Sequence, residues 1–244
     1  MRSDTLDALR RDWTTLGEAD PLWAVCVDPA KRGGRWNTGE FLASGRTEVT
    51  DVLAELDQLG GCQRQAAIDF GCGVGRTTAA LSDHFGTVTG IDISEPMLAH
   101  ARSLHSGKLN CRFLLHVKAD LSIFEDNSVD LVYSSLVLQH LPPTLADAYL
   151  TEFVRIVRPG GAIVIVVPES HLRTPGGLVY TYAPRSLIRW LQCRAFGFPA
   201  PMDMNTVPAS RVRAVVESRG ARLMASVPRG ISGHWRMSAH CIRV

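Results

Sequence analysis

Residues 66–81 read AAIDFGCGVGRTTAAL and contain the pattern that decides the fold. A short apolar run ends in Asp69 and Phe70, and a loop with glycine at every second position follows. Beyond Arg76, the composition favours a helix over residues 77–85. A strand, a glycine-rich turn and a helix in this order form a cradle for a small molecule. The glycines let a ligand approach the backbone, and the start of the helix presents free N–H groups.

The glycines of this loop do not complete the dinucleotide-binding pattern. That pattern, G-x-G-x-x-G, requires a third glycine where this chain has Arg76. A nicotinamide-dependent oxidoreductase is therefore a weaker alternative, and it predicts that NAD(H) raises the melting temperature of the protein.

Apolar runs of strand length alternate with helical segments after residue 65. With helices between them, strands are expected at 66–70, 87–91, 111–116, 129–133 and 162–167. Such alternation predicts a parallel sheet with helices on both faces and right-handed crossovers. Two further strands, 221–227 and 237–244, are expected after a helix, joined by a loop too long for a tight hairpin.

Two acidic residues stand at the ends of predicted strands. Asp92 ends the second strand, and Asp120 follows the third. Ligands of open α/β sheets bind beyond the carboxyl ends of the strands, where the strand order reverses. A carboxylate there can accept two hydrogen bonds from the vicinal hydroxyls of a ribose. Either acid could instead be a helix cap or a turn residue.

The chain resembles the class I S-adenosylmethionine-dependent methyltransferases in four segments: AIDFGCGVG, GIDISEPML, ADLSIFEDNSVDLVYSSLVLQHL and VRPGGAIVIVVP. These segments lie within residues 66–167, and the two closing strands add weaker support. The resemblance implies an α/β fold with a single Rossmann-like, doubly wound, mostly parallel seven-stranded sheet. An N-terminal helical arm and a C-terminal antiparallel strand pair complete it. The resemblance also implies S-adenosyl-L-methionine as cofactor, S-adenosyl-L-homocysteine as product, and in-line transfer of the sulfonium methyl group to a small-molecule acceptor.

The resemblance also assigns binding roles to residues near the strand ends. Gly71 and Gly73 would lie against the methionine half of the cofactor, and Asp69 would hold the loop or the amino group. Asp92 would bind the ribose. The other expected contacts are with the adenine (Ile93, Met97, Asp120 and the Leu121 N–H), through backbone or amide groups (Ser134, Gln139), and with the cofactor carboxylate (Arg46, which could equally be a solvated arginine).

His140 is the candidate general base. It lies just past the fourth strand, beside the expected position of the methyl group, and imidazole titrates near neutral pH. Glu169 and His171 follow the fifth strand and could converge with His140 on one acceptor hydroxyl, or on a divalent cation such as Mg²⁺. Their spacing matches no recognised metal motif, so no metal site is expected. Alternatively, His140 could cap the next helix, and Glu169 and His171 could be exposed polar residues of a loop.

Composition limits the partners of the chain. The formal net charge is +2, from 26 Lys and Arg against 24 Asp and Glu, which indicates no nucleic-acid partner. The six cysteines form no C-x-x-C pair, so we expect free thiols in a reducing cytoplasm. No apolar run is long enough for membrane insertion, and a monomer and a homodimer are both open.

We expect an N-terminal helical arm or lid over residues 1–62 and a methyltransferase domain over 63–244, with an acceptor-binding insertion near residues 170–206. The leading hypothesis is O-methylation of a hydroxyl on a saccharide, polyketide or lipid-type metabolite, because a histidine stands at the reaction site and the insertion is rich in aromatic residues. An N- or C-methyltransferase is one alternative. A protein that binds S-adenosylmethionine without transferring its methyl group is another, because binding and chemistry use different residues.

Overall fold

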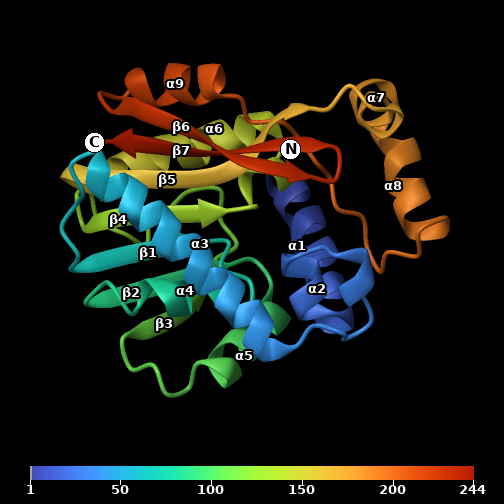
Figure 1. Cartoon of the computed structure of the whole chain (residues 1–244), viewed down its shortest axis with the longest axis horizontal. Coiled ribbons are helices and arrows are strands. Elements are labelled where there is room, and N and C mark those ends of the chain that lie inside the picture. The colour runs from blue at the N-terminus through green and yellow to red at the C-terminus, as the bar shows by residue number, and fades with distance from the viewer. Residues whose placement is uncertain (1) are drawn as a thin grey trace.

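The computed structural model describes residues 2–244. Its centre is a seven-stranded sheet in the order β3-β2-β1-β4-β5-β7-β6 (Figure 1). The neighbouring pairs from β3 to β5 are parallel, and β7 runs antiparallel to both β5 and β6. The strands are β1 (Ala66–Phe70), β2 (Thr87–Asp92), β3 (Cys111–Leu115), β4 (Val129–Ser135), β5 (Val157–His171), β6 (Arg222–Ser232) and β7 (Trp235–Arg243).

Helices cover both faces of this sheet (Figure 1). α3 (Thr38–Gln58) and α4 (Arg76–Leu81) bury their apolar side chains on one face, and α6 (Pro143–Ile156) and α9 (Ala209–Glu217) do so on the other. α5 (Glu95–Leu104) packs against β2 and β3. The predicted doubly wound, mostly parallel α/β sheet is therefore confirmed.

The central strand β1 shows how the two apolar layers form. Ile68 and Phe70 belong to the layer beneath α6, where the Phe70 ring lies 4.6 Å from that of Tyr149 and 5.0 Å from that of Phe153, between centroids. Ala67 points to the opposite layer, beneath α3. Because both faces are covered, these strands read as nearly continuous apolar runs in the sequence.

The N-terminal arm reaches the carboxyl ends of the strands. Its helices are α1 (Arg2–Ala19) and α2 (Pro21–Val25), followed by the short 3-10 helix η1 (Pro29–Lys31). The Ser94 hydroxyl, at the start of α5, donates to the Trp13 carbonyl over 3.1 Å and so ties α1 to the sheet. This contact places α1 over the carboxyl ends of the strands, and the arm therefore becomes part of the site described below.

The C-terminal third differs from the sequence-based expectation in its element bounds. α7 (Pro175–Tyr182) precedes the expected helix α8 (Arg185–Arg194), and β5 continues as far as His171. The last two strands are joined by only Gly233 and His234, whereas a long loop was expected. Gly233 has φ of 56°, which a two-residue turn requires, and a register shift between Pro228 and Ile231 absorbs the mismatch between the strands.

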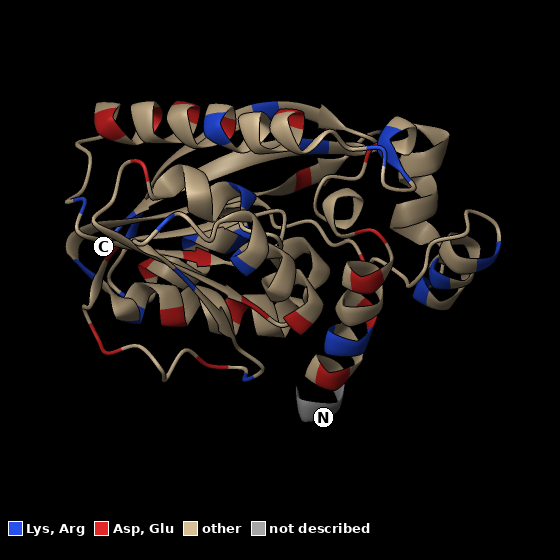
Figure 2. Ribbon diagram, turned by 90° about the horizontal axis from the view of Figure 1, so that it is seen from below, with Lys and Arg blue, Asp and Glu red and all other residues tan. Residues whose placement is uncertain are grey.

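Both signs of charge occur on the molecule, although single elements can carry mainly one sign, as α3 does with its acidic residues. Figure 2 shows both Lys and Arg and Asp and Glu around the sheet, whereas the long helix α3 carries five acidic residues and a single arginine. This mixture agrees with the low net charge of +2.

Candidate active site

A cavity lies beyond the carboxyl ends of β1, β2 and β4, where the strand order reverses. It encloses about 840 Å³ of empty space, counted out to the solvent at its mouth. Its floor is formed by strand-end residues (Phe70, Gly71, Gly73, Ile91, Asp92, Ile93). α1 contributes a roof of Leu6, Leu9 and Trp13, and α2 adds Ala24 and Val25. Most of the wall is thus apolar, with a few polar groups among it.

The glycine loop sits in close contact with two other segments. A Cβ at Gly71 would lie 2.3 Å from a methyl carbon of Val137, and one at Gly73 would lie 2.7 Å from a methyl carbon of Val25. Both glycines also have positive φ, of 73° and 52°. Because any larger residue would push these segments away, the glycines set the shape of the cavity floor.

Asp92 joins this loop to the end of β2. Its carboxylate accepts from the Gly73 N–H and from the Ser94 N–H, each over 2.8 Å. Burial raises the pKa of Asp92, and the two backbone donors oppose that shift. Each carboxylate oxygen keeps a further lone pair, so Asp92 can still accept hydrogen bonds from a ligand. Ile93 and Met97 line the cavity beside it.

Asp69 holds the loop from behind and does not line the cavity. Its carboxylate accepts from the Thr77 and Thr78 hydroxyls over 2.8 and 2.6 Å, at the start of α4. Burial raises the pKa of Asp69 to about 6, against the effect of these two hydroxyl donors. Of the two roles expected for Asp69, holding the loop is the one that its contacts support.

His140 lies in the short 3-10 helix η2 (Leu138–His140) and forms part of the cavity wall. Its Nδ1 atom lies 2.6 Å from the Asp203 carbonyl oxygen, and its ring packs edge-on against Trp13. A carbonyl only accepts, so Nδ1 carries the proton and the neutral ring keeps its lone pair on Nε2. Burial lowers the pKa of His140 to about 4, so the ring is neutral near pH 7.

The backbone leading into η2 is strained. Leu136 lines the cavity with φ of 62°, a left-handed conformation that leucine rarely adopts. Its N–H donates to the Val166 carbonyl over 2.9 Å, which holds this conformation in place. Strain of this kind clusters at functional sites. The neighbouring Ser135 also lines the cavity, and its buried hydroxyl helps to lower the pKa of Glu48.

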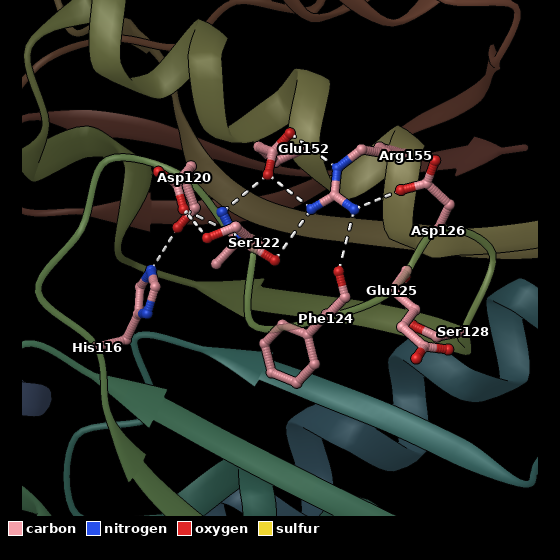
Figure 3. Close-up of polar contacts among 10 residues, drawn as sticks. His116, Asp120, Ser122, Phe124, Glu125, Asp126, Ser128, Glu152 and Arg155 are labelled. Carbon is pink, nitrogen blue, oxygen red and sulfur yellow. Dashed lines mark hydrogen bonds and ion pairs between the residues drawn. The ribbon is translucent and has the colours of Figure 1, made fainter.

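Arg46, Asp120 and Leu121 do not line this cavity, although the sequence predicted contacts with the cofactor for all three. Arg46 is exposed on α3 and does not line the cavity. Asp120 is exposed, and one of its carboxylate oxygens accepts from the Ser122 N–H and hydroxyl. The Leu121 N–H, expected to meet a ring nitrogen, donates to Glu152 over 2.8 Å. Figure 3 shows this group of contacts, in which Glu152 also pairs with Arg155.

The buried arginine near the cavity is Arg76 rather than Arg46. Its guanidinium lies 2.7 Å from one carboxylate oxygen of Glu48, and the other oxygen accepts from the Tyr133 hydroxyl over 2.5 Å. Burial opposes the charge, but Arg76 together with hydroxyl donors lowers the pKa of Glu48. α3 approaches closely enough for this pair because position 45 is glycine: a Cβ there would lie 2.5 Å from the Arg76 Cγ.

Ser134 and Gln139 are buried next to the cavity but are engaged elsewhere. The Ser134 hydroxyl donates to the Phe70 carbonyl over 3.1 Å. The Gln139 carbonyl accepts from Asn205, and its side chain lies against Met204. Both residues therefore position neighbouring backbone rather than forming the wall.

Glu169 and His171 do not converge with His140, contrary to the expectation. Glu169 accepts from the Ala209 N–H over 3.1 Å and lies 3.2 Å from the His240 imidazole. His171 packs against Trp235, with ring centroids 4.5 Å apart. The continuation of β5 beside β7 draws both residues away from the cavity. Within residues 2–244, no group of three or more His, Cys, Asp or Glu side chains could hold a metal ion.

Sequence reasoning did not identify the roof of the cavity or the far wall. The apolar spacing of Leu6, Leu9 and Trp13 predicts an amphipathic helix but does not say what the helix covers. Tyr149 and His116 also line the cavity, although neither stands in a recognisable motif. Only the tertiary arrangement brings these residues together.

Comparisons with known proteins agree with this geometry. Residues 68–165 match the family model described as a methyltransferase domain. The 2-methyl-6-phytyl-1,4-hydroquinone methyltransferase of Synechocystis is 28% identical over 168 residues, which cover 67% of this chain and 51% of that protein. The demethylmenaquinone methyltransferase of Staphylococcus aureus is 37% identical over 169 residues, which cover 62% of this chain and 68% of that protein. The chain thus spans about half the length of the first relative.

Solved structures show the same architecture. The magnesium protoporphyrin IX methyltransferase from Synechocystis, solved with bound S-adenosylmethionine, aligns with a TM-score of 0.64 at 18% identity, over 99% of this chain and 98% of that one. Fold, glycine loop and strand-end cavity define an α/β protein built to bind a nucleoside-containing cofactor. The chain belongs to the class I S-adenosylmethionine-dependent methyltransferases.

Proposed function

We propose that this chain transfers the methyl group of S-adenosylmethionine to a hydroxyl-bearing, largely apolar small molecule, with His140 as general base. One observation carries the proposal: the Asp203 carbonyl holds the proton on His140 Nδ1, in the wall of a cavity whose floor suits the cofactor. The arrangement leaves an unprotonated imidazole nitrogen at neutral pH. That is the form a general base requires.

The residues of the cavity floor fit the cofactor. The Asp92 carboxylate retains acceptor capacity for ribose hydroxyls, and Ile93 and Met97 offer apolar contact to an adenine ring. The Ser135 hydroxyl provides a further polar group in this wall. When bound here, S-adenosylmethionine supplies an electrophilic methyl group.

His140 would then remove the proton of the acceptor hydroxyl as the acceptor oxygen bonds to the methyl carbon. The bond from that carbon to the sulfonium sulfur would break with its electron pair left on sulfur, which gives S-adenosylhomocysteine. The proton goes to Nε2, while Nδ1 keeps its hydrogen bond to Asp203. The apolar side chains of Leu6, Leu9 and Trp13 on α1 would shield this region from water. Exclusion of water strengthens the electrostatic interactions inside the site and prevents competing hydrolysis.

The walls favour an apolar acceptor over a saccharide. Leu6, Leu9 and Trp13 face the cavity from α1, and Leu141 and Tyr149 from the other side. A sugar would leave its hydroxyls unpaired against such side chains, whereas a polyketide, phenol or lipid-type hydroxyl would bury apolar surface. Two relatives carry names that include a hydroquinone or a demethylmenaquinone. A hydroxylated ring is therefore the acceptor class that we infer.

A second candidate is methylation of a ring carbon beside such a hydroxyl. It is favoured by the same two relatives and uses the same base, because loss of the hydroxyl proton makes the adjacent ring carbon nucleophilic. The proposal also includes a cytoplasmic location, which the six free cysteines within residues 2–244 support, and either a monomer or a homodimer.

The test combines binding, transfer and product analysis. Isothermal titration measures affinity for S-adenosylhomocysteine, and radiolabelled S-adenosylmethionine measures transfer to phenols, hydroquinones and a sugar panel. Nuclear magnetic resonance of the product assigns the methyl group to oxygen or carbon. We expect binding, and transfer to the ring compounds. Binding without transfer to any acceptor would favour a protein that only binds the cofactor.

The substitution His140→Gln isolates the base. We expect kcat to fall by about a hundredfold or more, with affinity for S-adenosylhomocysteine unchanged. The exposed His100 on α5 provides the matched control, and His100→Gln should leave both quantities unaltered. Equal turnover in the two variants would refute the role of His140 and would favour an amine acceptor, which needs little help from a base.

A further inference from the structure

Two consecutive helices carry large apolar side chains into solvent. α7 and α8 lie at the edge of the molecule, outside the sheet and its covering helices (Figure 1). The exposed fraction is 80% for Tyr182, 57% for Trp190 and 61% for Phe196. Leu178, Val179 and Leu187 are also exposed in these two helices. We name these six residues the α7–α8 apolar face.

The two sides of α8 differ in their contacts. Gln192 is buried and its amide exchanges hydrogen bonds with the backbone of Met202, at 2.9 and 3.0 Å. Leu187, Trp190 and Arg194 follow one another at helical spacing on the opposite, exposed side. The inner side thus anchors the helix, while the outer side holds apolar residues that the anchoring does not require.

All the charged residues in the segment that carries this face are basic. Residues 172–202 contain four arginines and no acidic residue, in a chain whose charges are otherwise nearly balanced. Arg189 is paired with Asp12 and Asp203. Arg173 and Arg194 are exposed, and neither forms an ion pair within residues 2–244. Two arginines of this segment, Arg173 and Arg194, therefore offer positive charge that no acidic side chain of the described residues neutralises by an ion pair.

We propose that the α7–α8 apolar face docks on the surface of a lipid bilayer that contains anionic phospholipids. Helices with aromatic and leucine residues on one side and arginines beside them lie in the interface plane, with the apolar side among the acyl chains. Arginines contribute by attraction to anionic headgroups. Within residues 2–244, no helix is both long and apolar enough to cross a bilayer, so contact at one surface is the mode that fits.

The docked helices would lie next to the roof of the active site. Arg189 on α8 is 3.0 Å from the carboxylate of Asp12 on α1, the helix that covers the cavity. A lipid-type acceptor could then pass from the bilayer to the cavity beneath α1. This last step rests on the proposed function, but the docking itself does not.

Vesicle sedimentation tests the docking. The intact chain is spun with vesicles of phosphatidylcholine alone and of phosphatidylcholine mixed with phosphatidylglycerol. We expect binding to the anionic vesicles, strong reduction without phosphatidylglycerol, and strong reduction at about 1 M salt, where the screening length is about 3 Å. Because the readout is binding, its failure would leave the methyl-transfer proposal intact, and loss of transfer would leave the docking proposal intact.

Variants separate the apolar and the charge contributions. Trp190→Ser with Phe196→Ser, and Arg173→Gln with Arg194→Gln, should each lower the partition coefficient at least about tenfold. Leu109→Ser and Arg112→Gln are the matched controls, since both residues are exposed and lie at or just before the β3 edge. They should bind like the parent chain. Circular dichroism checks that every variant folds.

Two results would overturn the docking. One is equal sedimentation of the α7–α8 variants and the controls. The other is absence of vesicle binding together with a parent dimer that Trp190→Ser converts to a monomer, measured by light scattering. The second result would assign the α7–α8 apolar face to a second copy of this chain.

Discussion

The Nδ1 atom of His140 lies 2.6 Å from the carbonyl oxygen of Asp203, a residue distant in sequence in the segment that follows α8. This hydrogen bond fixes the tautomer of the ring, because a carbonyl oxygen cannot donate. Burial also lowers the pKa of His140 to about 4 from an ordinary value of 6.5. The ring therefore stays neutral, with an unprotonated nitrogen, at pH values well below 7.

The first prediction concerns the pH dependence of kcat. A base with a pKa of about 4 stays mostly unprotonated at pH 5.5, whereas one with a pKa of 6.5 would be only about 10% unprotonated there. We expect kcat at pH 5.5 to lie within about twofold of its value at pH 7.5. Steady-state kinetics across this range checks it. A roughly tenfold loss by pH 5.5 would show that His140 titrates normally or that another group is the base.

The second prediction compares two acids at strand ends. Asp92→Ala removes the acceptor from the cavity floor and also releases the Gly73 N–H, so affinity for S-adenosylhomocysteine should fall at least about tenfold. Asp120→Ala removes a carboxylate that is exposed and bound to Ser122, so affinity should stay within about twofold. Isothermal titration measures both. The site assignment fails if the two variants lose affinity equally.

These two acids also show what local sequence could predict. The alternation of strands and helices set the sheet, and Asp92 follows directly from the end of β2. The sequence offers the same pattern at Asp120 and Leu121. There, however, Glu152 on α6 takes the Leu121 N–H, and Arg155 holds Glu152 in place (Figure 3). A partner 31 residues away decides that position, and strand-end patterns contain no information about it.

The prediction that Glu169 and His171 converge with His140 was wrong for a different reason. Glu169 and His171 look like strand-end residues only if β5 stops at Val167, but pairing with β7 extends it to His171. The extension depends on the long β6–β7 hairpin, whose tight turn at Gly233 was not expected. The sequence did predict that Trp13 belongs to an amphipathic helix. It could not predict the position of that helix over the cavity, where the hydrogen bond from Ser94 holds it.

The third prediction concerns Arg189 as a positioning residue. Its guanidinium lies 2.9 Å from the Asp203 carboxylate and 3.0 Å from that of Asp12, so it connects the roof helix to the residue that holds His140. Arg189→Gln should lower kcat about tenfold and make α1 more accessible to limited proteolysis, with affinity for S-adenosylhomocysteine little changed. Arg189→Lys should restore activity only in part, because an ammonium group cannot reproduce the planar fork.

The control for Arg189 lies on the same helix. Arg194 is exposed and forms no ion pair within residues 2–244, so Arg194→Gln should leave kcat and the proteolysis pattern unchanged when both are measured without lipid. If Arg194→Gln and Arg189→Gln behaved alike, a general effect on α8 would replace the bridging role.

The fourth prediction concerns the stability contribution of Asp69. Its folded-state pKa is raised by burial to about 6, above the ordinary 3.8, so the folded chain binds more protons than the unfolded chain between these values. The contribution of Asp69 to stability is therefore complete below pH 3.8 and is lost as pH rises through about 6. Asn cannot ionise, so Asp69→Asn escapes this loss. The free energy of unfolding of Asp69→Asn relative to the parent should rise by about 1 kcal/mol between pH 5 and pH 8.

Urea unfolding at the two pH values measures this difference, and the comparison with the parent cancels other titrating groups. The two threonine hydroxyls that donate to Asp69 can also donate to an Asn side-chain oxygen, so the start of α4 should keep its anchor. Asp51→Asn, on the exposed side of α3, is the matched control and should change the free energy of unfolding equally at both pH values. A relative stability of Asp69→Asn that fell with rising pH would mean that Asp69 is ionised and stabilised in the folded chain. The pKa of Asp69 in the folded chain would then lie below its ordinary value of 3.8, and the effect of its hydroxyl donors would outweigh that of burial.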